Sequence, residues 1–564
     1  MSALADPFEA RRAVGATGLL REFNEIGVLS AADVHVAARL ASLVGEEREA
    51  VTLAVALAVR GPRLGHVFVD LATIRDTATV ESDEPVDLSE LPWPEVGEWL
   101  GGLAGSELVA VGEDGAGSSD ESKPLRLLGS RLYLDRYWRE ECAVAADLND
   151  MTAGGRLQVI AGGPGTGKTT RVAQIVAELL EEAVAAGARP PLIALAAPTG
   201  KAAARLQEAV YEQVAAGAGL QASTLHRLLG WRPGSHSRFA HDRGNRLPHD
   251  VVIVDETSMV GLSLMARLVE AIRSEARLIL VGDPGQLTSI EAGVVLGDIV
   301  DSGSRRPGDG VIVLDRVHRY GGGIAALADA IRQGDGDATV AALRAAPDEI
   351  TWLEMDVYET EAGLELVRDR AVAAGLQVVG AARSGEAMAA LAALGRFRLL
   401  CAHRRGPYGV SDWSSRIQGW LAPEIEDAEQ RDFVGRPLLV TENDYELGLY
   451  NGDTGVIVAG AGERRAAAFE RGGEVLRFSP LRLGAVETVY AMTIHKSQGS
   501  QFDTAAVLLP APTSRILTRE LLYTGVTRAR RELILIGTEA AVRQSVERPV
   551  ARASGLRERL WTRE

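Results

Sequence analysis

The sequence predicts an α/β protein with two stacked parallel-sheet domains, a small β-barrel insertion in the second of them, and a mixed α+β domain in front. Three observations predict this arrangement. A glycine-rich loop at 162–169 lies between an apolar segment and a helix-like one. Two blocks of sequence alternate short apolar segments with helical ones, which is typical of buried parallel strands. Residues 432–480, inside the second block, are instead β-rich and punctuated by glycine.

Length and composition limit the classes of protein to consider. The 564 residues leave room for about three or four domains, and 46% hydrophobic with 24% charged residues is typical of a globular chain. Cys142 and Cys401 lack C-x-x-C spacing, so we expect neither a disulfide framework nor a zinc site, and a reducing cytoplasm fits. No stretch reaches the roughly 18 apolar residues that cross a bilayer, so we expect no membrane association. The formal charge of −17 argues against nonspecific coating of nucleic acid, but it permits a narrow basic channel.

Changes in composition divide the chain. The N-terminal part holds one apolar strand candidate, 66–71, and no catalytic constellation, so we expect a docking domain that ends before the acidic, glycine- and serine-rich segment 112–122. The expected divisions are a docking domain at 1–110, a linker and lead-in at 111–150, the first α/β domain at 151–335, the start of the second α/β domain at 336–431, an SH3-like β insertion at 432–480, and the remainder of the second domain at 481–564.

The expected strands follow in chain order. They are 157–161, 192–197, 251–255, 278–282 and 311–314 in the first domain, and 398–401, 504–509 and 533–536 in the second. In the β insertion, the Asn-Gly pair within 450–453 predicts a tight hairpin. A smaller interruption at 231–250 carries several basic residues around two aromatic ones: Arg232, His236, Arg238, His241, Arg243 and Arg246 around Trp231 and Phe239. This composition fits a solvated surface hairpin and a DNA-facing hairpin equally.

The glycine-rich loop reads GGPGTGKT and has the spacing of a phosphate-binding loop. Its backbone N–H groups and the following helix N-terminus can hold phosphates, Lys168 can reach the β- and γ-phosphates, and Thr169 can hold Mg²⁺. A merely flexible glycine loop is the alternative, but the full spacing between strand and helix argues against it. We therefore expect binding and hydrolysis of a nucleoside triphosphate. The expected nucleotide-binding residues are Gly162, Gly163, Pro164, Gly165, Thr166, Gly167, Lys168, Thr169 and Thr170.

Two further strands deliver polar residues to the same sheet edge. The strand 251–254 is followed by Asp255, which is placed to bind Mg²⁺, and by Glu256, a natural base for the attacking water. The alternative is that the two acids only cap the next helix. Strand 278–281 leads to Gln286, whose amide can orient water beside the γ-phosphate.

These residues carry a resemblance. The ordered segments GGPGTGKT, APTGKAAARL, STLHRLL, VIVDETSM, LVGDPGQL, LDRVHR, YAMTIHKSQGSQF and LLYTGVTRARREL, from about 157 to 537, resemble the motif set of superfamily-one DNA helicases of the RecD-like branch. The resemblance implies two RecA-like domains with ATP and Mg²⁺ in the cleft between them, single-stranded DNA across both, and 5′-to-3′ movement. A nucleotide kinase shares the phosphate loop but needs neither TIHKSQG nor TGVTRAR.

The resemblance also implies residue roles. Arg319 and Arg528 would stabilise charge on the γ-phosphate as arginine fingers, whereas a surface ion pair suits Arg530 or Arg531 better. The implied DNA contacts are Thr199, Lys201, Thr224, His226, Thr493, His495 and Lys496, with Tyr490 and Trp413 as speculative stacking platforms. One departure stands out: residues 142–156 lack the glutamine with which many such helicases read adenine, and the run is short for the helix expected there.

The first 110 residues show no helix-hairpin-helix repeats of the kind found in stand-alone helicases of this branch. Segments 33–47 and 65–71 instead resemble the N-terminal domain of RecD, the alpha subunit of exodeoxyribonuclease V. That resemblance implies docking on RecC in a heterotrimer in which RecB supplies a second motor and the nuclease, acting on DNA ends in double-strand break repair. A stand-alone helicase and an ATP-regulated DNA-binding scaffold are the alternatives. We expect no nuclease site in this chain, because acids such as Glu424 and Glu426 lie in a charged helical stretch.

Overall fold

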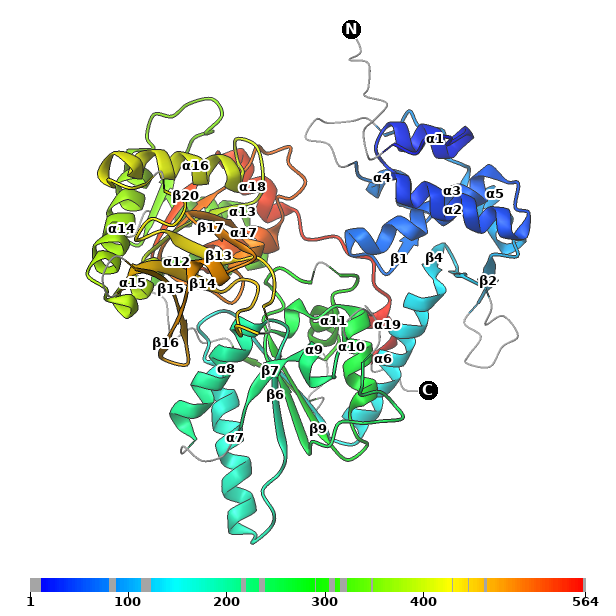
Figure 1. Ribbon diagram of the computed structural model, residues 1–564. Coiled ribbons are helices and arrows are strands. Elements are labelled where there is room, and N and C mark those ends of the chain that lie inside the picture. Colours follow the sequence, from blue (N-terminus) through cyan, green and yellow to red (C-terminus); the bar gives the residue numbers. More distant parts are fainter. Residues whose placement is uncertain are drawn as a thin grey trace.

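The computed structural model describes residues 12–80, 88–112, 123–214, 220–232, 239–289, 291–303, 310–314, 322–345, 348–428, 430–444, 446–460 and 464–560. These residues form four β-sheets with covering helices. Figure 1 shows the N-terminal domain in blue, the first α/β domain in cyan and green, and the second in light green to red beside the first. Within the described residues no helix is long and apolar enough to cross a membrane.

The N-terminal domain packs helices against a four-stranded sheet in the order β1-β4-β3-β2. Its elements are α1 (Gly18–Glu25), α2 (Ala31–Val44), α3 (Glu49–Arg60), η1 (Gly61–Leu64), β1 (Phe68–Asp70), α4 (Ile74–Thr77), α5 (Val96–Ala104), β2 (Val109–Val111), β3 (Leu125–Leu128) and β4 (Arg131–Leu134). Helix α3 is the central one, because its run of alanine, valine and leucine is buried almost all round. The expected boundary at residue 110 is wrong: β4 pairs with both β1 and β3, so the acidic segment interrupts this domain and does not end it.

The first α/β domain has six parallel strands in the order β10-β5-β9-β8-β6-β7. Its elements are α6 (Asp135–Ala153), β5 (Leu157–Gly162), α7 (Lys168–Ala185), β6 (Ile193–Ala197), α8 (Gly200–Gln213), β7 (Ala222–Thr224), α9 (Leu225–Leu228), β8 (Val251–Val254), η2 (Thr257–Met259), α10 (Leu262–Ala271), β9 (Arg277–Gly282), α11 (Val295–Gly303) and β10 (Val311–Leu314). One sheet face packs on α6, α10 and α11, and the other on α7 and α8. Because β5, β9 and β8 are neighbours, the loops that follow them meet at one edge.

The structure bears on two local expectations in this domain. The helix before the phosphate loop is complete, because α6 begins at Asp135, earlier in the sequence than expected. In the interruption, Arg243 pairs with Asp147 at 2.6 Å and Arg246 donates to the carbonyl of Ile272 at 2.5 Å. The described part of the interruption therefore packs on the domain as a surface turn; His236 and Arg238 lie outside the described residues.

The second α/β domain has five parallel strands in the order β11-β20-β19-β12-β18. Its elements are α12 (Gly322–Gln333), α13 (Gly336–Arg344), β11 (Ile350–Leu353), α14 (Glu365–Arg383), α15 (Ala387–Leu394), β12 (Phe397–Cys401), α16 (Val410–Leu421), η3 (Ala422–Glu424), β18 (Ala491–Thr493), η5 (His495–Ser497), β19 (Phe502–Leu508), α17 (Arg519–Val526), β20 (Ala529–Ile536) and α18 (Glu539–Glu547). The expected boundary at 335 is wrong, because the apolar face of α12 is buried in the core of this second domain.

The β insertion is an antiparallel sheet in the order β16-β15-β14-β13-β17. Its elements are β13 (Pro437–Val440), β14 (Thr454–Ala459), β15 (Arg465–Arg471), β16 (Glu474–Phe478), η4 (Pro480–Arg482) and β17 (Val486–Thr488). The β insertion therefore ends at β17, beyond the expected residue 480, because β17 completes the sheet beside β13. A turn closed by Asp453 N–H and Tyr450 O at 2.9 Å confirms a reversal at the Asn-Gly pair, although it ends a long connection and is not a two-residue hairpin.

A C-terminal segment, residues 549–560, joins the parts of the molecule. It leaves the second α/β domain and crosses to the other two, as the red trace in Figure 1 shows. Val67 N–H donates to Ala553 O at 2.7 Å, and Ala553 N–H donates to His66 Nδ1 at 3.0 Å. Helix α19 (Leu556–Arg559) then packs on α6 and α11. The C-terminal segment thus seats the N-terminal domain on the first α/β domain.

His66 is expected to make the protein less stable as the pH falls below neutrality. Burial, followed by the charges of Arg60 and Arg552, lowers the pKa of His66 from 6.5 to about 4. As the pH falls, the imidazole of the unfolded chain is protonated near pH 6.5, whereas that of the folded chain is protonated only near pH 4. The free energy of unfolding therefore decreases across that window, by about 3 kcal/mol at most. Urea unfolding between pH 7 and pH 4.5 measures the loss. His66→Asn keeps an acceptor but cannot titrate, so it should lose less; an equal loss in both proteins would contradict the assignment.

Candidate nucleotide site and domain interface

The phosphate loop is a closed turn between β5 and α7. Gly165 and Gly167 adopt φ angles of 79° and 84°, a region that favours glycine. Gly162 has no room for a side chain, because a Cβ there would lie 2.7 Å from Thr166 Oγ1. The Thr166 hydroxyl donates to Gly163 O at 2.9 Å. This turn leads directly into the N-terminus of α7, where free backbone N–H groups favour an anion.

Lys168 lies over this loop. Its ammonium donates to the carbonyls of Gly162 at 2.6 Å and Gly163 at 2.7 Å. Both carbonyls belong to the turn that is shaped for phosphate, so the charge of Lys168 is held at the predicted place. The neighbouring Thr169 begins the same helix and faces the acid described next.

Asp255 lies at the carboxyl end of β8 and is only 8% exposed. Burial and the charge of Glu256 raise the pKa of Asp255 to about 7, while Lys168 and the Thr169 hydroxyl oppose this shift. The structure thus brings together the lysine, hydroxyl and carboxylate that were predicted from separate segments. Among the described residues, no three histidine, cysteine or acidic side chains cluster as a metal site.

Glu256 has an unusual backbone. Its φ of 52° is the one positive value among described residues other than glycine, and such strain often accompanies function. The alternative of a helix cap is not supported, because the Glu256 side chain makes no capping hydrogen bond to η2. This left-handed residue comes immediately after Asp255, at the carboxyl end of β8.

Gln286 follows β9 at the same edge of the sheet. It is buried, with 4% exposure, and its amide donates to Asp283 Oδ2 at 3.0 Å. The bond holds the amide in one orientation, as a group that orients water requires.

The next residue, Leu287, connects the two α/β domains. Its N–H donates to Thr524 Oγ1 at 2.9 Å, and its carbonyl accepts from Gln498 Nε2 at 2.7 Å. Tyr523 adds a contact to the phosphate loop, since a Cβ on Gly163 would lie 3.0 Å from its hydroxyl. We call the Leu287, Gln498, Tyr523 and Thr524 contacts the interdomain clasp. Tyr523 and Thr524 were not among the predicted site residues, although they lie within the LLYTGVTRAR segment that signalled this region.

Arg528 lies behind the interdomain clasp, in the second α/β domain. It is 3% exposed and donates from Nε to Thr524 O at 2.9 Å and from Nη1 to Ser500 O at 3.2 Å. Thr524, a residue of the interdomain clasp, is therefore bonded directly to Arg528. Arg319 lies outside the described residues.

The residues expected to contact DNA divide by their local roles. Thr199 and Thr224 cap α8 and α9, and Thr493 Oγ1 accepts from Lys496 N–H at 3.2 Å. Lys201 donates to Ser500 Oγ at 2.7 Å across the domain interface. Burial, with help from Arg205, lowers the pKa of Lys201 to about 8, against the charge of Asp453. The contacts of these three threonines and of Lys201 to DNA stay predictions.

The two predicted histidines and the speculative stacking residues also differ in exposure. His226 is exposed beside Phe239, with ring centroids 5.9 Å apart, and His495 is half-buried near Arg552. Lys496 is partly exposed at the end of the same loop. Trp413 cannot serve as a stacking platform, because it is 1% exposed and its indole N–H donates to Pro407 O. Tyr490 lines a pocket together with residues of α14 and β12.

A phosphate loop, a buried acid at the end of β8 in the same sheet and a second domain held by the interdomain clasp define a two-domain nucleotide-driven motor, and the comparisons place it among the superfamily-one DNA helicases. Three family models match in order: the RecBCD enzyme subunit RecD N-terminal domain at 25–133, an AAA domain at 145–354, and a UvrD-like helicase C-terminal domain at 488–536.

Whole-length relatives give the family. The chain is 48% identical over 581 residues to RecBCD enzyme subunit RecD of Mycolicibacterium smegmatis, which covers 96% of this chain and 99% of that protein. RecBCD enzyme subunit RecD of Mycobacterium tuberculosis is 48% identical over 97% of this chain and 98% of its own. The ATP-dependent RecD2 DNA helicase of Deinococcus radiodurans is 31% identical over 82% of this chain, but the match covers only 57% of that protein. The chain belongs to the RecBCD enzyme subunit RecD family and is an ATP-dependent DNA helicase.

Proposed function

We propose that this chain is the 5′-to-3′ motor of a RecBCD-type heterotrimer, assembled with RecB and RecC on DNA ends in the cytoplasm. Its work there would be double-strand break repair by homologous recombination and DNA degradation, with nuclease chemistry left to the assembly. The full-length similarity to RecD subunits is the observation that carries the proposal, since the match covers 99% of the Mycolicibacterium protein. The N-terminal domain supports it, because the matched RecD N-terminal region, 25–133, corresponds to the folded unit that ends with β4.

The nucleotide chemistry follows from the site. ATP phosphates would lie on Gly162–Thr170, with Lys168 neutralising the β- and γ-phosphates. Thr169 and Asp255 fit Mg²⁺, because a hydroxyl and a buried carboxylate face each other there, and the ion would neutralise phosphate charge. Glu256 would take the proton of the attacking water, which Gln286 orients. Arg528, from the second domain, and Arg319 would stabilise the transition state.

Coupling of hydrolysis to movement is supported by the interdomain clasp. Leu287 directly follows Gln286, so a group beside the γ-phosphate is one peptide away from the residues that hold the second domain. Loss of phosphate at Gln286 would shift Leu287 and, through it, α17 and the loop of Gln498. Thr199, Lys201, Thr224, His226, Thr493, His495 and Lys496 would contact the DNA backbone across both domains.

Co-expression tests the assembly. The chain should co-purify with two large partners. The complex should unwind tailed duplexes with 5′-to-3′ polarity, and Lys168→Ala in this subunit alone should remove that activity. A variant that lacks residues 1–134 has lost the whole N-terminal domain. It should no longer bind its partners but should still bind ATP. Retention of both partners by that truncation would overturn the docking role.

Thr493→Ala and Lys496→Ala are expected to weaken DNA binding more than basal ATP hydrolysis. Lys496→Ala removes one cation from a phosphate path, so the slope of log Kd against log salt should fall by about 0.7. Fluorescence anisotropy with single-stranded DNA at several salt concentrations measures the slope. Arg482→Ala, on the β insertion, is the control, and an unchanged slope for Lys496→Ala would contradict the proposed path.

A further inference from the structure

The β insertion contacts both α/β domains. We call its attachment, residues 435–437 and 489–490, the root, and the turn at 450–453 the tip. The root is continuous with the second domain, from which the insertion emerges, whereas the tip reaches α8 of the first. Figure 1 shows the insertion above α8.

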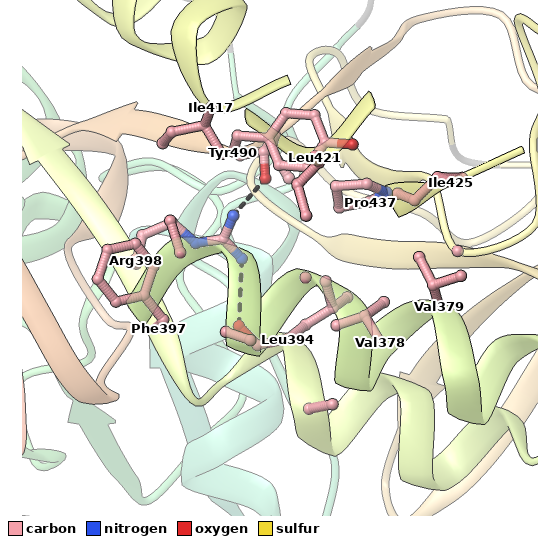
Figure 2. A pocket seen from close by; sticks show the side chains of 16 residues that line it. Val378, Val379, Leu394, Phe397, Arg398, Ile417, Leu421, Ile425, Pro437 and Tyr490 are labelled. Carbon is pink, nitrogen blue, oxygen red and sulfur yellow. Dashed lines mark hydrogen bonds between the residues drawn. The ribbon is translucent and has the colours of Figure 1, made fainter. Parts of the chain in front are cut away.

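The root is held by a buried arginine of β12. Arg398 is 3% exposed, and its guanidinium donates to the carbonyls of Val489 and Leu394, as Figure 2 shows. Gly435 lies directly against α14, since a Cβ there would lie 2.5 Å from Val379 Cγ2. Because both chains of the root are fixed in this way, the β insertion must follow the second domain when that domain moves.

The tip presents one aromatic ring to the first domain. Gly200 begins α8, and a Cβ on it would lie 2.6 Å from Tyr450 Cγ, so the ring packs directly on the helix backbone. The β insertion itself holds this ring: Tyr450 N–H donates to Asp453 Oδ2 at 2.9 Å, and the Arg471 guanidinium lies 4.8 Å from the ring centroid. Arg471 also pairs with Asp453 at 2.8 Å.

A second bridge lies beside the tip. Lys201, the next residue of α8, donates to Ser500 Oγ of the second domain at 2.7 Å. The first turn of α8 is therefore contacted by the β insertion and by the second domain together. This turn follows β6, whose neighbour β8 carries Asp255, so the bridge lies one strand from the nucleotide site.

We propose that Tyr450 is a positioning residue that transmits the nucleotide-driven movement between the two α/β domains into the β insertion, and that this contact sets how much strand movement each ATP yields. With its root in one domain and its tip on the other, the β insertion bridges the two domains and would move with every change in their arrangement. The proposal rests on the helicase activity, but it concerns yield per ATP and not hydrolysis itself.

The test compares Tyr450→Ala with Tyr450→Phe in the full-length chain, assembled with its partners where translocation requires them. Tyr450→Ala should keep ATP hydrolysis on single-stranded DNA near the wild-type rate while the number of nucleotides travelled per ATP falls about tenfold. Tyr450→Phe keeps the ring and should retain the wild-type ratio. Leu481→Ala is the control, because Leu481 lies on the same insertion with 93% exposure. If Tyr450→Ala travels as many nucleotides per ATP as the wild type, or if Leu481→Ala shows an equal fall in that number, the proposal is overturned. A wild-type protein that does not hydrolyse ATP would instead count against the motor assignment.

A reversible crosslink gives a second readout. In Gly200→Cys with Tyr450→Cys, the two Cβ positions lie 2.9 Å apart, close enough for a disulfide after a small outward shift. Oxidation should hold the two α/β domains in one arrangement and stop DNA-stimulated ATP hydrolysis. A thiol reductant should restore the hydrolysis. Failure to crosslink would show that the tip does not lie on α8, and an oxidised enzyme that cycles as fast as the reduced one would show that the cleft moves without the insertion.

Discussion

Lys168→Ala is expected to abolish ATP hydrolysis in a protein that remains folded. The side chain is held by two carbonyls of the phosphate loop and contributes charge where phosphate must bind. Removing a preorganised charge that stabilises the transition state costs about a thousandfold or more in rate. The change removes no apolar core volume, so the thermal midpoint should stay near that of the wild type. Phosphate release with saturating single-stranded DNA measures the first quantity, and circular dichroism measures the second.

Arg171→Ala is the matched control. Arg171 lies on the same helix, and its guanidinium pairs with Glu178 at 2.8 Å on the solvent side. It removes the same unit of charge within one turn of Lys168, but away from the loop. Hydrolysis should stay near wild type in this variant. Turnover near the wild-type rate by Lys168→Ala would show that the nucleotide binds elsewhere.

Arg528→Lys is expected to reduce DNA-stimulated hydrolysis about a thousandfold, the loss typical of an arginine finger. A lysine keeps the charge, but it cannot reproduce the planar fork with which Arg528 bonds Thr524 O and Ser500 O together. Both partners adjoin the contacts that join the domains, so the substitution would affect the transition state and the interdomain clasp at once. Single-turnover hydrolysis with and without DNA measures the loss.

Arg531→Lys provides the comparison for this second change. Arg531 is exposed on β20, three residues further along the chain, and its replacement should leave hydrolysis unchanged. The melting temperature of Arg528→Lys must also be measured, because a buried arginine supports the local fold. A stable Arg528→Lys protein with wild-type turnover would remove Arg528 from the catalytic set.

The sequence predicted the strands of the first α/β domain well. Each apolar segment from 157 to 314 that we expected as a strand is one, because buried parallel strands need continuous apolar runs that are hard to mistake. Lys168, Thr169 and Asp255 come together because parallel strands of one sheet end at the same edge, and only β9 separates β5 from β8. Local pattern was enough to place these residues.

Contacts between distant segments were not predictable in the same way. The bond between Leu287 N–H and Thr524 depends on how two complete domains meet, which no spacing encodes. The boundary at 110 was placed too early because an acidic segment within a domain has the same composition as a linker. Trp413 was considered as a stacking platform because sequence cannot tell a buried indole from an exposed one.

The C-terminal segment imposes an order on biogenesis. Residues 549–560 leave the ribosome after every element that they join, so a nascent chain holds β1 and α6 without the backbone and apolar partners that later cover them. Such surfaces are what chaperones hold and proteases cut. A product stopped short of Val550 would therefore carry an intact phosphate loop on a poorly seated N-terminal domain, and cells would clear it as a folding failure although its nucleotide chemistry is complete.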